Sequence, residues 1–137
     1  MEEKQLHLMS LVVPAKAEYL SMIRLTVAAV AKDTGFPDDS ISDLKVALSE
    51  AASNVVRHAY PKTTPTERCI IEITCYRKPG CLLIEVIDHG CGMTVPPPPS
   101  EGLGFGIIGS LMDKVDVETG KDGTTILLEK VPARNRG

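Results

Sequence analysis

One stretch of the chain, ALSEAASNVVRHAY, places a carboxylate and an amide where they could act together. Glu50 and Asn54 are four residues apart, and this spacing puts both side chains on one face of a helix. An amide oxygen suits a hydrated Mg²⁺, which takes oxygen ligands and keeps several waters. The carboxylate of Glu50 can then act as a general base and accept a proton from a nucleophilic hydroxyl. The simpler alternative is that both are solvated residues on the polar side of an amphipathic helix.

Two further polar side chains, Arg57 and His58, occupy neighbouring positions of the same helix face. His58 is a candidate catalytic acid, because imidazole changes its charge near neutral pH. A hydrogen-bonded structural histidine is the more common role for such a residue, so both roles stay open.

A second candidate group is the segment IDHGCG, in which an aspartate ends a strand-like run. The carboxylate of Asp88 can accept hydrogen bonds from an exocyclic amine and from a ring N–H or a water. Gly90 and Gly92 have no Cβ, so they would let a planar ring approach the backbone. This segment therefore predicts a site for a nucleotide base.

A third group is the segment GLGFG, with Gly102, Gly104 and Gly106, which runs into an expected helix. The unpaired N–H groups and the positive dipole end of a helix N-terminus favour phosphate oxygens. Neither glycine set is a P-loop, because no G-x-x-x-x-G-K-[ST] occurs, and no strand precedes GLGFG as a dinucleotide fingerprint requires. Considered alone, the glycines and the four prolines between them are typical of a Pro/Gly-rich surface loop.

The order of the motifs is more specific than any one of them. E-x-x-x-N on a helix is followed by D-x-G-x-G after a strand, G-x-G-x-G before a helix, and Gly123 and Thr124 before the last strand.

Composition limits the classes of function that have to be considered. The 137 residues are enough for one domain with a single core, and 43% hydrophobic with 24% charged residues is typical of a soluble globular protein. The net charge of −3 and the lack of a long Lys/Arg run argue against a nucleic-acid surface. The first residues are more typical of a strand than of a signal peptide, and no apolar run is long enough to span a bilayer. We expect a cytoplasmic protein.

The cysteines give little sign of a metal or redox site. They form no C-x-x-C pair and have no histidine at finger-like spacing, so zinc is not expected. Three of them, Cys69, Cys75 and Cys81, lie in strand-like sequence and are expected to behave as small hydrophobes. Cys91 lies inside the first glycine loop, where an exposed thiol is open to modification, although the sequence shows no activating base or charge.

The chemistry-bearing segments must be positioned by the elements around them. Apolar periodicity and Gly/Pro punctuation predict strands at 6–13, 69–76, 81–88, 115–119 and 124–130, and helices at 17–32, 40–60 and 105–113. Ser40 and Asp43 resemble a capping box at the start of the second helix. Its apolar stripe, which should face the sheet, consists of Ile41, Leu44, Leu48, Ala51, Val55 and Ala59.

The segregation of helices and paired strands predicts an α+β fold. We expect a two-layer sandwich, in which helices cover one face of a mainly antiparallel sheet. Residues 1–137 then form a single domain, with a frayed tail at 132–137.

The combined motifs resemble the histidine-kinase-like ATPase superfamily, which includes gyrase, mismatch-repair ATPases and sensor kinases. Within it, nearly the whole chain is similar to the bacterial anti-sigma factor serine/threonine kinases. SEAASNVVRHAY resembles their Asn-containing box, IDHGCGM the first glycine box, GLGFGIIGSLMDKVDVET the second, and DGTTILLEK the closing one. MIRLTVAAV is similar to their first helix.

This resemblance implies ATP and Mg²⁺ as cofactors and assigns roles to individual residues. Glu50 would be the base, Asn54 the Mg²⁺ ligand and Asp88 the acceptor for the adenine amine. Gly92 would lie beside the base, Gly104 and Gly106 would border the phosphates, and Thr124 would line the adenine site. Gly90 and Gly102 belong to the same two glycine boxes.

The resemblance also implies protein partners. Such proteins dimerise, and they either sequester a sigma factor or phosphorylate a serine or threonine of an anti-anti-sigma protein. Arg24 matches a first-helix arginine that faces these partners, although a surface cation can equally be only solvated.

The segment between the glycine boxes corresponds to the ATP lid of the family. Residues 93–101 contain no Lys or Arg, and VPPPPS favours an extended polyproline strut. Three hypotheses remain: a kinase that is also an anti-sigma factor, a non-catalytic nucleotide-gated binding module, and a switch kinase that activates a stress-signalling phosphatase. Glu50 favours catalysis, the short lid favours the binding module, and MIRLTVAAV favours the anti-sigma type over the switch type.

Overall fold

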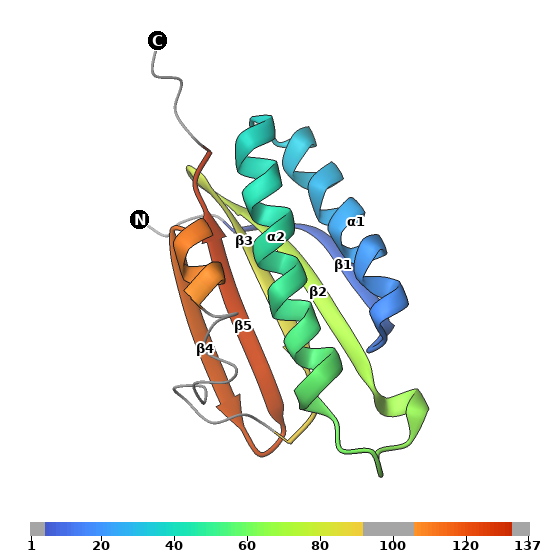
Figure 1. The fold of residues 1–137 in the computed structure, drawn as a ribbon. Helices are drawn as coiled ribbons and strands as arrows, with labels where there is room; N and C mark the ends of the chain where they lie inside the picture. Colours follow the sequence, from blue (N-terminus) through green and yellow to red (C-terminus); the bar gives the residue numbers. More distant parts are fainter. Residues whose placement is uncertain (1–4, 92–105, 133–137) are drawn as a thin grey trace.

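The computed structural model describes residues 5–91 and 106–132, and Figure 1 shows their fold. Within them, one antiparallel sheet has the strand order β1-β2-β3-β5-β4. The strands are β1 (Leu6–Pro14), β2 (Ile70–Lys78), β3 (Cys81–Asp88), β4 (Lys114–Gly120) and β5 (Gly123–Lys130). The predictions for Gly92, Gly102, Gly104, the segment 93–101 and the tail 133–137 lie outside the described residues.

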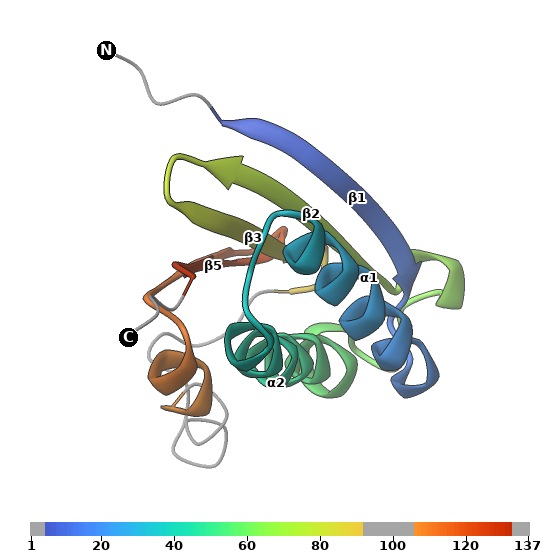
Figure 2. The same ribbon diagram turned by 90° about the horizontal axis from the view of Figure 1, so that it is seen from above.

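The helical elements are the 3₁₀ turn η1 (Ala17–Tyr19), α1 (Leu20–Asp33), α2 (Asp38–Asn54), the π-helix η2 (Val55–Ala59) and the 3₁₀ turn η3 (Thr66–Arg68). Residues 106–111 are also helical and are drawn in orange in Figure 1. Figure 2 shows α1, α2 and the orange helix on the same side of the sheet. The prediction of a two-layer α+β sandwich is confirmed.

The core lies between the sheet and the helices because each element buries one face. Side chains of β2, β3 and β5 alternate between buried and half-buried, as the twofold period of a strand requires. All six residues of the apolar stripe expected on the second helix are buried. Because α2 packs this stripe on the sheet, the positions of its polar residues relative to β3 and β5 are fixed.

The start of α2 differs from the prediction. The helix begins at Asp38, with Pro37 as its extended N-cap residue, and no side chain caps it. Ser40 lies inside the first turn rather than at the N-cap, so the expected capping box with Asp43 is wrong. Asp38 and Asp39 in the first turn instead complement the positive end of the helix dipole.

The end of α2 also differs from a regular helix. Regular α-helical winding stops at Asn54, and Val55–Ala59 continue as a π-helix. Such wide turns are rare and occur frequently at functional sites. The predicted helix therefore has nearly the expected extent, but its geometry changes directly after the candidate Mg²⁺ ligand.

Candidate functional site

Asp88 is the last residue of β3 and is held by two backbone donors. Its partner across the sheet is Thr124 of β5. Oδ1 of Asp88 accepts hydrogen bonds from the Gly90 N–H at 2.9 Å and the Thr124 N–H at 3.2 Å. The side chain is buried, with 4% of the residue exposed. Strand pairing therefore fixes the direction of this carboxylate.

The environment of Asp88 opposes its charge and supports it at the same time. Burial raises the pKa of this carboxyl above its ordinary value, while the N–H groups of Gly90 and Thr124 and the charge of His89 act in the opposite direction. A carboxylate in such a position is a strong acceptor, because little water competes for its oxygens.

Asn54, the last residue of α2, lies next to Asp88 and Thr124. It is buried, and it lines a cavity of about 20 Å³ together with Asp88 and Thr124. Oδ1 of Asn54 accepts a hydrogen bond from Nη2 of Arg57 at 3.2 Å, and Nδ2 has no partner among the described residues. The alternative of a solvated amide is wrong for Asn54. A cavity of this size holds about one water.

His58 is exposed but borders the same cavity. The side chain of His58 is therefore close to the buried residues Asn54 and Asp88. Both roles considered for His58 stay open.

Glu50 lies elsewhere, in a groove between α1 and α2. It is half-buried and lines a space of about 380 Å³ with Arg24, Lys45 and Ser49, among others. Arg24 donates a hydrogen bond from Nη1 to Oγ of Ser49 at 3.3 Å, and Ser49 donates to the carbonyl of Lys45 at 2.8 Å. Arg24 is therefore anchored on α2 beside the candidate base.

Two glycines allow the backbones around Asp88 to approach closely. A Cβ on Gly90 would lie 2.0 Å from the carbonyl oxygen of Ala59, and one on Gly123 would lie 2.1 Å from the carbonyl oxygen of Asp88. Gly123 also has φ +129°, a conformation that favours glycine. Gly106 lies in the helix at 106–111, and a Cβ there would meet no described atom within 4 Å.

This chain is similar to known proteins over most of its length. Residues 13–130 match the model of the histidine kinase-like ATPase domain. The chain belongs to this family. A protein of Bacillus cereus named serine-protein kinase RsbW is 35% identical, over 90% of this chain and 84% of the relative. A Bacillus anthracis protein of the same name is 34% identical over the same shares. The expected resemblance to serine/threonine kinases of this family is confirmed.

Solved structures share the fold. The RsbU and RsbW domains of a Mycobacterium tuberculosis protein match 93% of this chain with a TM-score of 0.72 and 21% identity. The match covers 34% of that longer chain. A blue-light activated histidine kinase of Erythrobacter litoralis matches 88% of this chain and 42% of its own length, with a TM-score of 0.60 and 21% identity.

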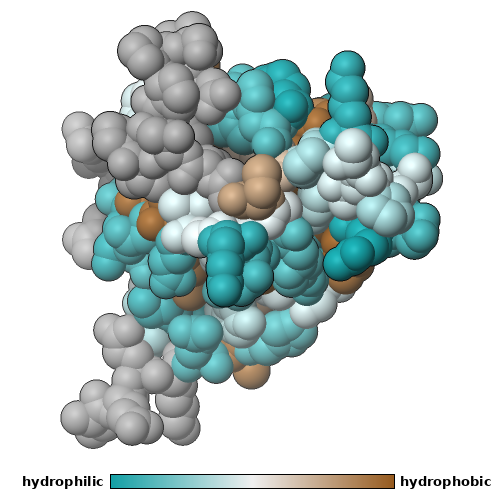
Figure 3. Space-filling model, turned by 90° about the horizontal axis from the view of Figure 1, so that it is seen from below, coloured by the Kyte–Doolittle hydropathy of each residue, from teal (hydrophilic) through white to brown (hydrophobic). Residues whose placement is uncertain are grey.

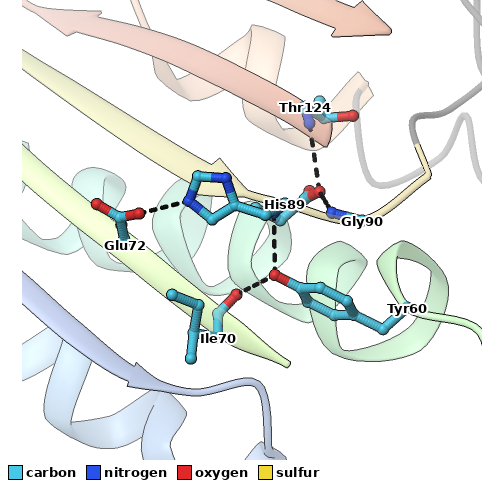
Figure 4. A network of polar contacts seen from close by, with 7 residues as sticks. Tyr60, Ile70, Glu72, His89, Gly90 and Thr124 are labelled. Carbon is cyan, nitrogen blue, oxygen red and sulfur yellow. Dashed lines mark hydrogen bonds and ion pairs between the residues drawn. The ribbon is translucent and has the colours of Figure 1, made fainter. Parts of the chain in front are cut away.

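Sequence reasoning on this ATPase domain missed Tyr60. Figure 4 shows its hydroxyl between β2 and the loop that follows β3. It donates to the carbonyl of Ile70 at 2.6 Å and accepts the N–H of His89 at 3.0 Å. The sequence contains one signal for Tyr60. It directly follows Ala59, the last residue of the apolar stripe, and apolar packing alone does not require a hydroxyl at that position.

Figure 3 draws the end of the ATPase domain at which α2 finishes. Hydrophilic residues cover most of its described surface, and hydrophobic patches are small. A groove of about 330 Å³ is lined by Tyr60, His89, Cys91, Arg68 and Lys121, among others. The rim of this groove is therefore cationic, although the whole chain has a net charge of −3.

The cysteines are all thiols. Cys75 is buried, and desolvation raises its pKa to about 12, as expected of a small buried hydrophobe. Cys91 is exposed, and its N–H donates to the carbonyl of Ala59 at 3.2 Å.

Among the described residues, no helix is both long and apolar enough to cross a membrane.

Proposed function

We propose that this chain is an anti-sigma factor and an ATP- and Mg²⁺-dependent protein serine/threonine kinase. It sequesters a sigma factor and phosphorylates an anti-anti-sigma protein. The observation that carries the proposal is the convergence of Asp88, Thr124 and Asn54 on one buried cavity. Family membership and the curated relatives support the kinase part, and the partner proteins extend beyond them.

The base of the nucleotide binds at Asp88 in this proposal. Because the N–H groups of Gly90 and Thr124 share one carboxylate oxygen, Oδ2 is left for the 6-amino group of adenine. Thr124 supports the site through its backbone N–H, which holds Asp88, while its hydroxyl pairs with the hydroxyl of Thr119 at 2.8 Å. Gly90 lies in the loop beside the base, and Gly92, Gly102, Gly104 and Gly106 are proposed to complete the base and phosphate contacts.

The residues present fit a magnesium ion bound together with phosphates. Asn54 supplies a neutral oxygen, and Mg²⁺ characteristically takes one or two protein oxygens with waters and phosphate oxygens. When bound, the ion neutralises charge on the phosphates. Arg57 now donates to the same amide oxygen, and its positive charge there opposes the binding of a cation to that oxygen.

The groove between α1 and α2 receives the protein target in this proposal. Glu50 accepts the proton of the target hydroxyl while the hydroxyl oxygen attacks the γ-phosphorus and the bond to ADP breaks. Arg24 and Lys45 provide positive charge beside Glu50 for a partner surface. An open groove suits this task, because the substrate is a folded protein.

Two further features belong to the proposal. A homodimer is supported by β1, an edge strand of the described sheet on which Leu6 and Val12 are 59% and 57% exposed. A cytoplasmic location follows from the proposed sigma factor, since that partner works with RNA polymerase.

The deciding experiment has two stages. Calorimetric titration with ATP and ADP, with and without Mg²⁺, should show micromolar binding. The protein is then incubated with labelled ATP and each anti-anti-sigma candidate of the source genome, and sigma-factor binding is measured in parallel. Binding without transfer would support the nucleotide-gated module, and transfer without sigma binding would support the switch kinase. Absence of nucleotide binding would overturn the proposal.

A further inference from the structure

The loop that follows Asp88 is docked on the end of the helix that carries Asn54. The N–H of His89 donates to the Tyr60 hydroxyl, and the N–H of Cys91 donates to the carbonyl of Ala59. Between these two bonds, Gly90 approaches Ala59 so closely that a Cβ would lie 2.0 Å from its carbonyl oxygen. Residues 89–91 therefore follow the surface of the last helical turn.

Tyr60 joins three segments through one oxygen atom. Its hydroxyl donates to Ile70 at the start of β2 and accepts from His89, the residue directly after Asp88 (Figure 4). Burial is the main cause that raises the pKa of Tyr60, so the hydroxyl keeps its proton and remains a donor at neutral pH. Both hydrogen-bonding directions of this hydroxyl are in use, which fixes its position.

The neighbouring ion pair is a weaker link. Nε2 of His89 lies 2.5 Å from Oε1 of Glu72, but the two side chains are 53% and 33% exposed. Exposed pairs of this kind contribute little to stability. The backbone bond to Tyr60 is therefore the stronger of the two links that hold His89, the residue between Asp88 and Gly90.

We propose that Tyr60 is a positioning residue that sets the base selectivity of the nucleotide site. By holding the His89 N–H, it keeps the next residue, Gly90, in the place from which its N–H orients the Asp88 carboxylate toward the 6-amino group of adenine. This inference rests on the proposed role of Asp88. Tyr60 touches neither the nucleotide nor the transferred phosphate in it.

The test compares ATP with inosine triphosphate, which has a 6-oxo group in place of the amine. Affinities are measured by calorimetry for the wild-type full chain and for Tyr60→Phe. The control is Tyr76→Phe, which removes the hydroxyl of a different tyrosine, on β2. The wild type and Tyr76→Phe should prefer ATP. In Tyr60→Phe the ratio of the two affinities should fall roughly fivefold, since one neutral hydrogen bond is removed.

Two further measurements separate positioning from folding. Glu72→Gln breaks the ion pair and keeps both the His89 N–H and its imidazole, so its selectivity should remain that of the wild type. In the wild type, ATP should slow hydrogen exchange at the His89 amide more than inosine triphosphate does.

The outcomes are distinct. A Tyr60→Phe protein with a lower Tm but an unchanged affinity ratio would reduce Tyr60 to a structural residue. Equal protection of the His89 amide by both nucleotides would also overturn the inference. A wild type that does not distinguish the two nucleotides would instead remove the proposed role of Asp88.

Discussion

The two candidate regions, one around the buried Asn54 at the end of α2 and one in the groove between α1 and α2, differ in burial and in how their side chains are held. Asn54, Asp88 and Thr124 are each at most 5% exposed and border a cavity of about 20 Å³. Glu50 and Arg24 are half-buried and line a groove of about 380 Å³. Backbone N–H groups orient Asp88, whereas Arg24 is held, within the described part of the chain, by one hydrogen bond between side chains.

This difference corresponds to the two proposed tasks. Recognition of a small planar base needs a dehydrated acceptor with a fixed direction, which strand pairing supplies. Transfer to a protein needs groups that a large partner can reach, and the outer surface of two helices provides them. Substitutions in the two regions should therefore separate binding from transfer.

The largest effect is expected from Glu50→Gln. Removal of the general base should slow phosphoryl transfer by about 10²–10⁴-fold, while the affinity for ATP remains unchanged. A quench-flow assay with labelled ATP measures the first quantity, and calorimetry measures the second. Glu18→Gln is the matched control, because Glu18 is exposed at the start of the helical layer. Transfer at the wild-type rate in Glu50→Gln would show that another group takes the proton.

Asp88→Asn should impair nucleotide binding, which Glu50→Gln leaves unchanged. Loss of the charged acceptor should weaken ATP and ADP binding equally, by roughly tenfold to a hundredfold. Equilibrium dialysis measures both affinities. Asp116→Asn, at an exposed position of β4, should leave them unchanged. A loss confined to ATP would place Asp88 at the phosphates rather than at the base.

Asp88→Asn should also change the pH dependence of folding. Because the native pKa of Asp88 is raised, its contribution to stability is fully present below the pKa of the unfolded chain and is lost as pH rises through the native pKa. At neutral pH the variant should therefore gain stability on the order of 1 kcal/mol relative to the wild type. Urea unfolding of both proteins between pH 4 and about 7 measures the difference. A constant difference would contradict a raised pKa.

Gly90→Ala should disturb the buried region around Asp88 and leave the groove between α1 and α2 intact. The new Cβ would overlap the Ala59 carbonyl, so the loop must move, at a cost of about 1–3 kcal/mol. Nucleotide affinity should fall about tenfold. Gly109→Ala is the control, since a Cβ there meets no described atom within 4 Å and alanine favours a helix. Equal thermal unfolding of the two variants would contradict the close packing.

The smallest effect is expected from Arg57→Ala. Removal of the guanidinium releases the amide oxygen of Asn54, so half-maximal ATP binding should need about two- to fivefold less Mg²⁺. A Mg²⁺ titration at fixed ATP measures this, with the exposed Arg77→Ala as control. A higher Mg²⁺ requirement would mean that Arg57 assists the phosphates.

By itself, the sequence determined the layers of this fold and most of its strand and helix positions. The alternation in β2 and β3 and the apolar stripe of α2 follow from the two local periods, and a side chain of the wrong polarity at these positions would be costly to bury. Motif order was enough to select Glu50, Asn54, Asp88 and Thr124 as candidates.

Tertiary structure decided which of these candidates meet. Only the pairing of β3 with β5 brings Thr124 to Asp88, and only packing of α2 on the sheet buries Asn54 beside them. The two hydrogen bonds of Tyr60 join residues that are 10 and 29 positions apart in the chain. Such contacts leave no period in the chain, because they are selected by the approach of three elements rather than by local conformation.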